Sequence, residues 1–131
     1  EVLLKGSGIA VIAVGSMVET AMDAGKLLEE EGICATVVNA RFVKPLDTQL
    51  LSQLSSSHRL VVTMEENVLN GGYGQSVAAY YAGCCGNMPR VLPVGIPDIF
   101  VEHGNVAVLK KELSLDGPSV AKRILEAWRQ L

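Results

Sequence analysis

The feature that most constrains the fold is an unbroken apolar run near the start of the chain. Residues 8–16 read GIAVIAVGS, with an aliphatic side chain at every position from 9 to 14 and no alternation with polar residues. A strand with one face in water alternates, whereas a continuous aliphatic run is typical of a parallel strand covered on both faces. Such a strand needs helices on both sides of its sheet, so this run predicts an α/β fold.

Further strand patterns recur along the chain. Residues 33–40 (ICATVVNA) and 59–66 (RLVVTMEE) predict two more buried strands, and residues 90–96 (RVLPVGI) predict a strand that Pro93 moves toward a sheet edge. Residues 1–6 (EVLLKG) are short and partly polar, which favours an antiparallel edge strand.

Helix signals separate these strands. Ser16 and Glu19 form the S-x-x-E pattern of a capping box, and Asp47 follows a proline stop as the cap of a second helix. Further helices are expected over residues 74–83, near residues 105–113 and after Pro118. The last helix is expected to pack through a stripe of Val120, Ile124, Trp128 and Leu131.

Strands that alternate with helices predict a three-layer α/β/α sandwich with right-handed crossovers. Residues 1–131 are expected to form a single domain, since their length is that of one ordinary domain and no linker or internal repeat divides them. The sequence begins with Glu1 rather than methionine, from which we expect a fragment of a longer chain.

Composition argues against several classes of partner. The 11 basic and 14 acidic residues are scattered, which predicts no nucleic-acid or membrane partner, and no apolar run reaches the length of a membrane span. Cys34, Cys84 and Cys85 lack the spacing of a metal or redox site. They are expected to be buried or half-buried structural thiols in a reducing cytosol.

The glycine-rich stretch at residues 65–76 (EENVLNGGYGQS) invites a phosphate-loop interpretation. The G-x-G-x-x-G pattern fails because Val77 stands where the third glycine belongs, and the P-loop pattern fails because no lysine follows. The glycines instead predict a tight strand-to-helix turn, in which they supply positive φ angles or remove side chains where the helix meets the strand. Some anion affinity at the helix N-terminus stays open.

No self-contained active site emerges from the remaining polar residues. Glu65 and Glu66 are adjacent on a strand end and point to opposite faces, so we expect one to be solvated and one to bond loop amides. His58 and His103 lack a nucleophile or a metal set in sequence and are interpreted as structural, although His103 could cap a helix or contact a partner.

Four stretches taken together resemble a known family. Residues 8–21, 32–47, 60–80 and 94–104 occur in the order and approximate spacing of the C-terminal domain of 1-deoxy-D-xylulose-5-phosphate synthases. The first three also resemble the C-terminal domains of transketolases and of pyruvate dehydrogenase beta subunits. NARFVKPLD at residues 39–47 combined with GIPDIFVEHG at residues 95–104 favours the synthase.

The resemblance implies a fold and a function. The family's domain has a five-stranded, mostly parallel sheet with an antiparallel edge strand. The family's enzymes use thiamine diphosphate and magnesium to join pyruvate and glyceraldehyde 3-phosphate, with loss of CO2, into 1-deoxy-D-xylulose 5-phosphate, a precursor of isoprenoids, thiamine and pyridoxal. The cofactor and catalytic residues belong mainly to the preceding domains, so no catalytic, cofactor-binding or metal residue is assigned here.

The same resemblance implies how the chain is used. The fragment alone is expected to be inactive and to assemble with the N-terminal thiamine-binding domains of its own chain, within a cytoplasmic homodimer, or in a plastid if the source is a plant. Candidate interdomain or subunit contacts are Glu65, Glu66, Asn67, Tyr73 and His103.

Two alternatives remain open at this point. One is a stand-alone regulatory module that binds a small anion at the Gly71–Gly74 turn. The other is the equivalent domain of a transketolase or of a 2-oxoacid dehydrogenase beta subunit.

Overall fold

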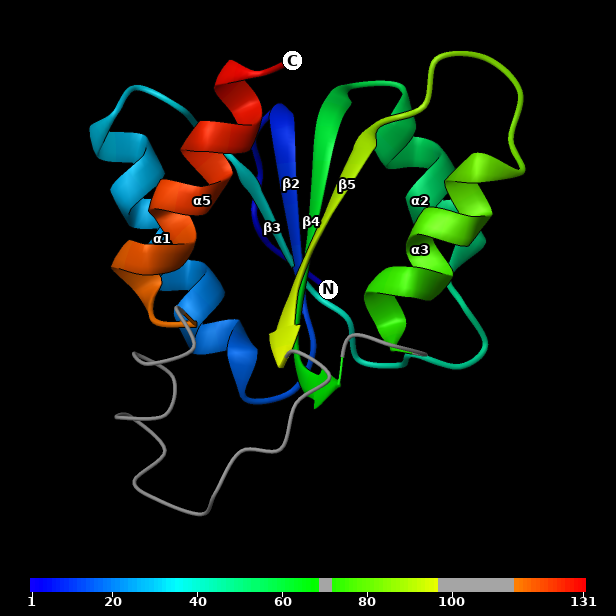
Figure 1. The fold of residues 1–131 in the computed structure, drawn as a ribbon, viewed down its shortest axis with the longest axis horizontal. Coiled ribbons are helices and arrows are strands. Elements are labelled where there is room, and N and C mark those ends of the chain that lie inside the picture. Colours follow the sequence, from blue (N-terminus) through cyan, green and yellow to red (C-terminus); the bar gives the residue numbers. More distant parts are fainter. Residues whose placement is uncertain (69–71, 97–114) are drawn as a thin grey trace.

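A five-stranded sheet lies between two layers of helices in the computed structural model, which describes residues 1–68, 72–96 and 115–131 (Figure 1). Helices α1 and α5 cover one face, and α2 and α3 cover the other. No described helix has the length and apolar character needed to cross a membrane. The elements are β1 (Val2–Leu4), β2 (Gly8–Ala13), α1 (Met17–Glu30), β3 (Thr36–Asn39), α2 (Thr48–Ser55), β4 (His58–Val68), α3 (Tyr73–Ala82), β5 (Arg90–Ile96) and α5 (Gly117–Arg129).

The predicted central strand is β2. The strand order is β1-β3-β2-β4-β5, and β2 pairs in parallel with β3 and β4. Residues 9–13 are all fully buried, with Ile9 and Val11 packed in the core under α1 and α5 and Ile12 in the core under α2 and α3. The unbroken apolar run is therefore explained by burial on both faces, and the three-layer α/β/α prediction is confirmed.

Both predicted edge strands are confirmed. β1 pairs antiparallel with β3, while β4 and β5 are parallel. Pro93 lies on β5, opposite Thr63, at the other edge of the sheet. Proline cannot donate a ladder hydrogen bond, and an edge strand leaves one side of its backbone without a neighbour in the sheet.

The two predicted helix caps differ in outcome. At α2 the Asp47 carboxylate accepts a hydrogen bond from the Leu50 amide at 3.0 Å, as expected. At α1 the helix begins after Ser16 as predicted, but the Ser16 side chain makes no capping hydrogen bond. Ser16 has helical backbone angles (φ −67°, ψ −12°), whereas a capping side chain normally folds back from an extended residue. The capping-box prediction is therefore wrong.

Helix α5 packs on α1 largely as predicted. Val120 and Ile124 are fully buried and Trp128 is partly buried against the same core. Leu131 follows the end of the helix and is 40% exposed, so its place in the packing stripe was wrongly predicted. The helix expected near residues 105–113 lies outside the described residues.

The cysteine prediction is wrong for two of the three thiols. Cys34 and Cys85 are exposed, and only Cys84 is half-buried, with its Sγ donating to the Tyr80 carbonyl at 3.3 Å. All three cysteines lie in connections between helices and strands. The usual burial of free cysteine, on which the prediction was based, therefore does not hold for them.

His58 is a structural histidine, as predicted, although it begins β4 rather than lying in the connection before it. It is buried, and its Nε2 lies 2.8 Å from the Thr36 hydroxyl on β3. Its Nδ1 lies 3.1 Å from the Leu54 carbonyl on α2, which as a carbonyl can only accept. The ring therefore joins β3, α2 and β4 at the amino ends of the strands.

The glycine turn brings α3 against the sheet. A Cβ on Gly74 would lie 2.5 Å from Thr63 Oγ1 on β4 and 2.9 Å from Pro93 Cβ on β5. The close-approach role predicted for this turn is therefore confirmed. Gly72 has φ −84°, and neither Gly72 nor Gly74 is among the described glycines with positive φ, so the positive angles expected of the turn are not found at these two positions.

This contact predicts that Gly74→Ala lowers the free energy of unfolding by about 1–3 kcal/mol, because the added methyl group overpacks the junction between α3 and the sheet. Urea unfolding followed by circular dichroism measures the change. Gly83→Ala is the matched control, since Gly83 ends the same helix at φ −86° and a methyl group there would lie 3.6 Å from its nearest neighbour. Equal unfolding midpoints for Gly74→Ala and wild type would contradict the prediction.

Candidate functional site

The candidate site lies at the carboxyl ends of the parallel strands, the lower edge of the sheet in Figure 1, which we call the carboxyl edge. Open α/β sheets generally bind ligands or partners at this edge, because loops from several strands converge there. The segments that form the candidate site there include the loop of residues 40–47 after β3, the end of β4 and the start of α3.

Glu65 connects the end of β4 to the start of α3. Its side chain is fully buried, with Oε1 accepting from the Tyr73 amide at 3.0 Å and Oε2 from the Gly74 amide at 2.8 Å. The N-cap residue Gly72 has no side chain with which to accept these hydrogen bonds. Glu65 therefore supplies the cap from a neighbouring strand and places a carboxylate at the positive end of the helix dipole.

This arrangement decides between the two interpretations of the glycine turn. An external anion at the N-terminus of α3 would need the same two backbone amides that Glu65 already occupies. The geometry therefore counts against a small-anion site at this turn. As expected, one of the adjacent carboxylates bonds backbone amides, but those bonded to Glu65 belong to the first turn of α3 rather than to the loop, and the Glu66 side chain is exposed.

A cavity of about 520 Å³ opens beside the Glu65 junction. It lies between the loop after β3 and the first turns of α2 and α3. Its walls are formed by Glu1, Asn39, Ala40, Arg41, Phe42, Lys44, Pro45, Leu46, Asp47, Thr48, Gln49, Leu50 and Tyr73.

Tyr73 lines this cavity, and its side chain is uncharged. Burial raises the pKa of Tyr73 to about 12, and the nearby negative charges of Asp47 and Glu65 act in the same direction. Both effects disfavour the phenolate, so the side chain stays protonated well above neutral pH.

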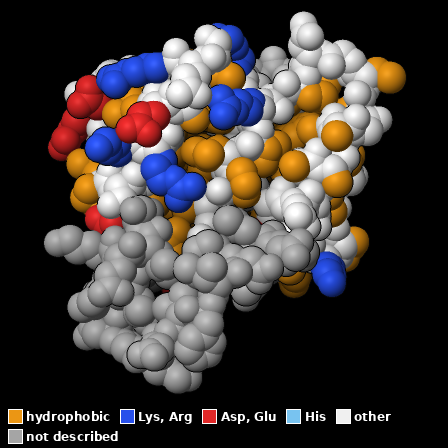
Figure 2. All heavy atoms as spheres, viewed as in Figure 1, with side chains coloured by type: hydrophobic (Ala, Val, Ile, Leu, Met, Phe, Trp, Pro, Cys, Tyr) orange, Lys and Arg blue, Asp and Glu red, His pale blue; other side chains and the backbone are white. Residues whose placement is uncertain are grey.

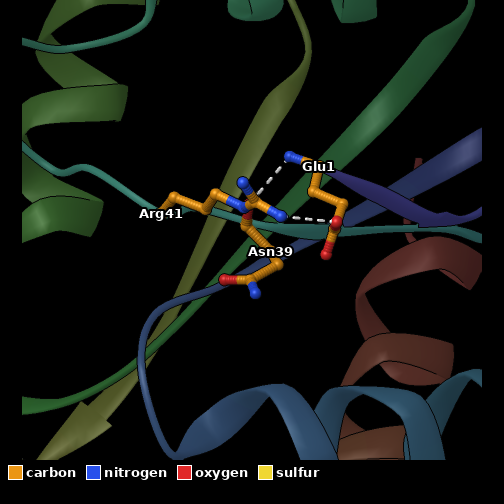
Figure 3. Close-up of polar contacts among 3 residues, drawn as sticks. All are labelled: Glu1, Asn39 and Arg41. Atoms are coloured by element: carbon orange, nitrogen blue, oxygen red, sulfur yellow. Dashed lines mark hydrogen bonds and ion pairs between the residues drawn. The ribbon is translucent and has the colours of Figure 1, made fainter.

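The rim of the cavity carries an exposed ion pair, shown in Figure 3. Arg41 Nη2 lies 2.7 Å from Glu1 Oε2, and the Glu1 backbone nitrogen donates to the Asn39 carbonyl at 3.1 Å. Exposed pairs of this kind contribute little to stability, about 0–1 kcal/mol. Here the ion pair and the hydrogen bond matter for geometry, because together they hold residue 1 against the start of the loop that follows β3.

The structure brings some of the predicted contact residues together. Glu65 and Tyr73 meet directly, and Glu66 follows Glu65 on β4 with its side chain exposed. The backbone of Asn67 belongs to β4, but its side chain is outside the described part of the structure, as is the whole of His103.

Sequence reasoning missed the loop after β3 as a surface feature. Phe42 is 77% exposed and Val43 is 38% exposed, although both are hydrophobic. A signal was available, because this apolar pair stands between Arg41 and Lys44 and belongs to no helix or strand pattern.

The described residues do not fit a metal-diphosphate cofactor. Among them, no group of three or more His, Cys, Asp or Glu side chains is placed to hold a metal ion. The N-terminus of α3 has its first two amides bonded to Glu65, so this helix end offers no cradle for a diphosphate.

The fold, with its carboxyl edge, is shared with a known family of protein domains. The family model for the transketolase C-terminal domain matches residues 1–120, and the chain belongs to that family. A solved structure described as a split-gene transketolase, an inactive beta4 tetramer, superimposes with a TM-score of 0.86 and 33% identity. The match covers 98% of this chain and 41% of that one.

Relatives place the chain more narrowly within the family. A 1-deoxy-D-xylulose-5-phosphate synthase from Chlorobium phaeovibrioides is 43% identical over 93% of this chain and 19% of its own length. The synthase from Caldanaerobacter subterraneus is 44% identical over the whole chain and 21% of its own length. The chain thus spans about a fifth of these relatives and is consistent with the C-terminal domain of such a synthase.

The Glu65 contact predicts a graded loss of stability. Glu65→Ala leaves two buried amides without an acceptor and lowers the free energy of unfolding by about 2–4 kcal/mol, while Glu65→Gln keeps one acceptor oxygen and loses about half as much. Urea unfolding measures both. Glu29→Gln, an exposed glutamate on α1, is the control and changes stability by less than about 0.5 kcal/mol. Wild-type stability in Glu65→Ala would disprove the anchoring role.

Proposed function

We propose that the chain works as the C-terminal domain of a 1-deoxy-D-xylulose-5-phosphate synthase. The observation that carries the proposal is the identity of 43–44% to enzymes of that name along nearly the whole chain. The family match and the similarity to a transketolase structure agree with it. The full protein would convert pyruvate and glyceraldehyde 3-phosphate into 1-deoxy-D-xylulose 5-phosphate and CO2.

The chemistry of this reaction would lie outside the domain. Thiamine diphosphate supplies the carbanion chemistry in enzymes of this type, with its diphosphate held through magnesium. The start of α3 does not fit that group, since Glu65 already bonds the first two amides of this helix. We therefore assign the cofactor to the remaining four-fifths of a protein of the relatives' length.

The role of the domain would be assembly. It would be inactive alone, support the other domains of its chain and belong to a homodimer in the cytoplasm, or in the plastid of a plant. The split-gene transketolase offers a parallel, because its beta4 tetramer is described as inactive.

The predicted contact residues divide into two roles within this proposal. Glu66, Asn67, Tyr73 and His103 remain proposed contacts with other domains or with a second subunit. Glu65 is a positioning residue rather than a direct contact, because its carboxylate is buried and already bonded within the domain.

The proposal predicts that a full-length protein carrying this domain releases CO2 from pyruvate only when glyceraldehyde 3-phosphate is present, and that the 131-residue chain alone shows no turnover. Coupled detection of CO2 with mass spectrometry of the sugar phosphate measures both. The full-length protein assayed without thiamine diphosphate is the control. Ketol transfer between sugar phosphates without CO2 release would instead assign the domain to a transketolase.

A further inference from the structure

We propose that the loop of residues 41–46, with Phe42 as its anchor, is the surface through which this domain docks on the thiamine-binding part of the synthase chain. The inference rests on the proposed function and extends it to a specific contact. Neither the packing nor the stability of the domain explains why this loop exposes apolar side chains, and the proposed contact gives them a role.

The exposure of Phe42 is the first observation. Among the described residues, only four large hydrophobic side chains are exposed, and Phe42 at 77% is the most exposed of them. Val43 is another member and lies next to it in sequence, so two of the four occur in one short loop. Isolated exposed hydrophobic residues are normal, but an adjacent apolar pair on a convergent loop is typical of an interaction site.

The loop is held in place rather than free. At its start, the Ala40 amide donates to the Ala13 carbonyl at 2.9 Å, which fastens it to the end of β2. At its end, the Thr48 amide donates to the Leu46 carbonyl at 2.9 Å, and Leu46 packs against the core beneath α2 and α3. A loop fixed at both ends presents its apolar residues with little ordering cost on binding.

Charge around the anchor indicates the chemistry of the partner surface. Lys44 follows the apolar pair and is exposed, whereas Arg41, which precedes the pair, is exposed but already pairs with Glu1 at 2.7 Å. At the lower right of Figure 2, where Figure 1 places the loop from β3 to α2, hydrophobic and cationic side chains lie side by side. The complementary surface is an apolar pocket with carboxylates on its rim.

The position of Glu1 favours the same polypeptide over a foreign partner. Glu1 lines the cavity next to the loop and is bonded to Asn39 and Arg41 at its rim. In the proposed full-length enzyme the rest of the chain is covalently linked to this domain, and residue 1 lies beside the loop. A surface on the same chain is presented to its other domains at a high effective concentration.

Photo-crosslinking in the full-length protein tests the contact directly. Phe42 is replaced by the photoreactive analogue p-benzoylphenylalanine, the protein is irradiated, and linked peptides are identified by mass spectrometry. The expected product joins residue 42 to a peptide that precedes Glu1 and keeps the mass of a single chain. Absence of a link to that region, or a product with the mass of two chains, overturns the proposal. The same analogue at Leu131, which is 40% exposed, is the matched control and gives no such link.

A second variant measures the strength of the contact. In the full-length protein, Phe42→Asp raises the rate of limited proteolysis between this domain and the rest of the chain by about tenfold or more, because burial of a phenylalanine side chain no longer favours the docked state. Leu131→Asp leaves the rate unchanged. An unchanged rate in Phe42→Asp also overturns the proposal.

These readouts are independent of synthase activity. If the wild-type protein forms 1-deoxy-D-xylulose 5-phosphate but the variant with the analogue at position 42 gives no link, the docking surface alone is overturned. A protein that gives the link but has a different activity overturns the proposed reaction and keeps the docking surface.

Discussion

The carboxyl edge of this domain depends on two hydrogen bonds from backbone amides to one buried carboxylate. Glu65 accepts from Tyr73 and Gly74, which fixes the first turn of α3 against the end of β4. The approach is so close that only glycine fits at position 74 without a shift, and Thr63 Oγ1 beside it is buried without a hydrogen-bond partner. A buried polar group without a hydrogen-bond partner typically lowers stability by about 1–3 kcal/mol. The surrounding packing and the Glu65 hydrogen bonds must therefore offset this cost.

The junction between Glu65 and α3 limits which ligands the carboxyl edge can bind. An internal carboxylate occupies the N-terminus of α3, which counts against an anion site at this helix end. The junction also sets Tyr73 in the wall of the cavity beside the loop of residues 41–46. The edge therefore presents a fixed surface with an exposed apolar anchor at Phe42, which suits a contact between domains better than binding of a small anion.

Much of the fold could be predicted from the sequence because its signals were local. Pro93 indicated an edge strand and Asp47 a helix cap, and each depends mainly on backbone chemistry at that residue. The failures concerned geometry that tertiary packing decides. Ser16 has the residue type of a cap but a helical backbone, and Cys34 lies in an exposed connection despite the usual burial of thiols. The degree of exposure of Phe42 needed the structure, because hydrophobic composition does not show which side chains the core leaves out.

The central claim is that Glu65 bonds the amides at the start of α3, and amide hydrogen exchange measured by NMR tests it most directly. The account predicts slow exchange at Tyr73 and Gly74 in the wild type and markedly faster exchange at both amides in Glu65→Ala, with the central strand β2 unaffected. Rapid exchange of both amides in the wild type would contradict it, because the helix N-terminus would then be open to solvent and available to an external anion.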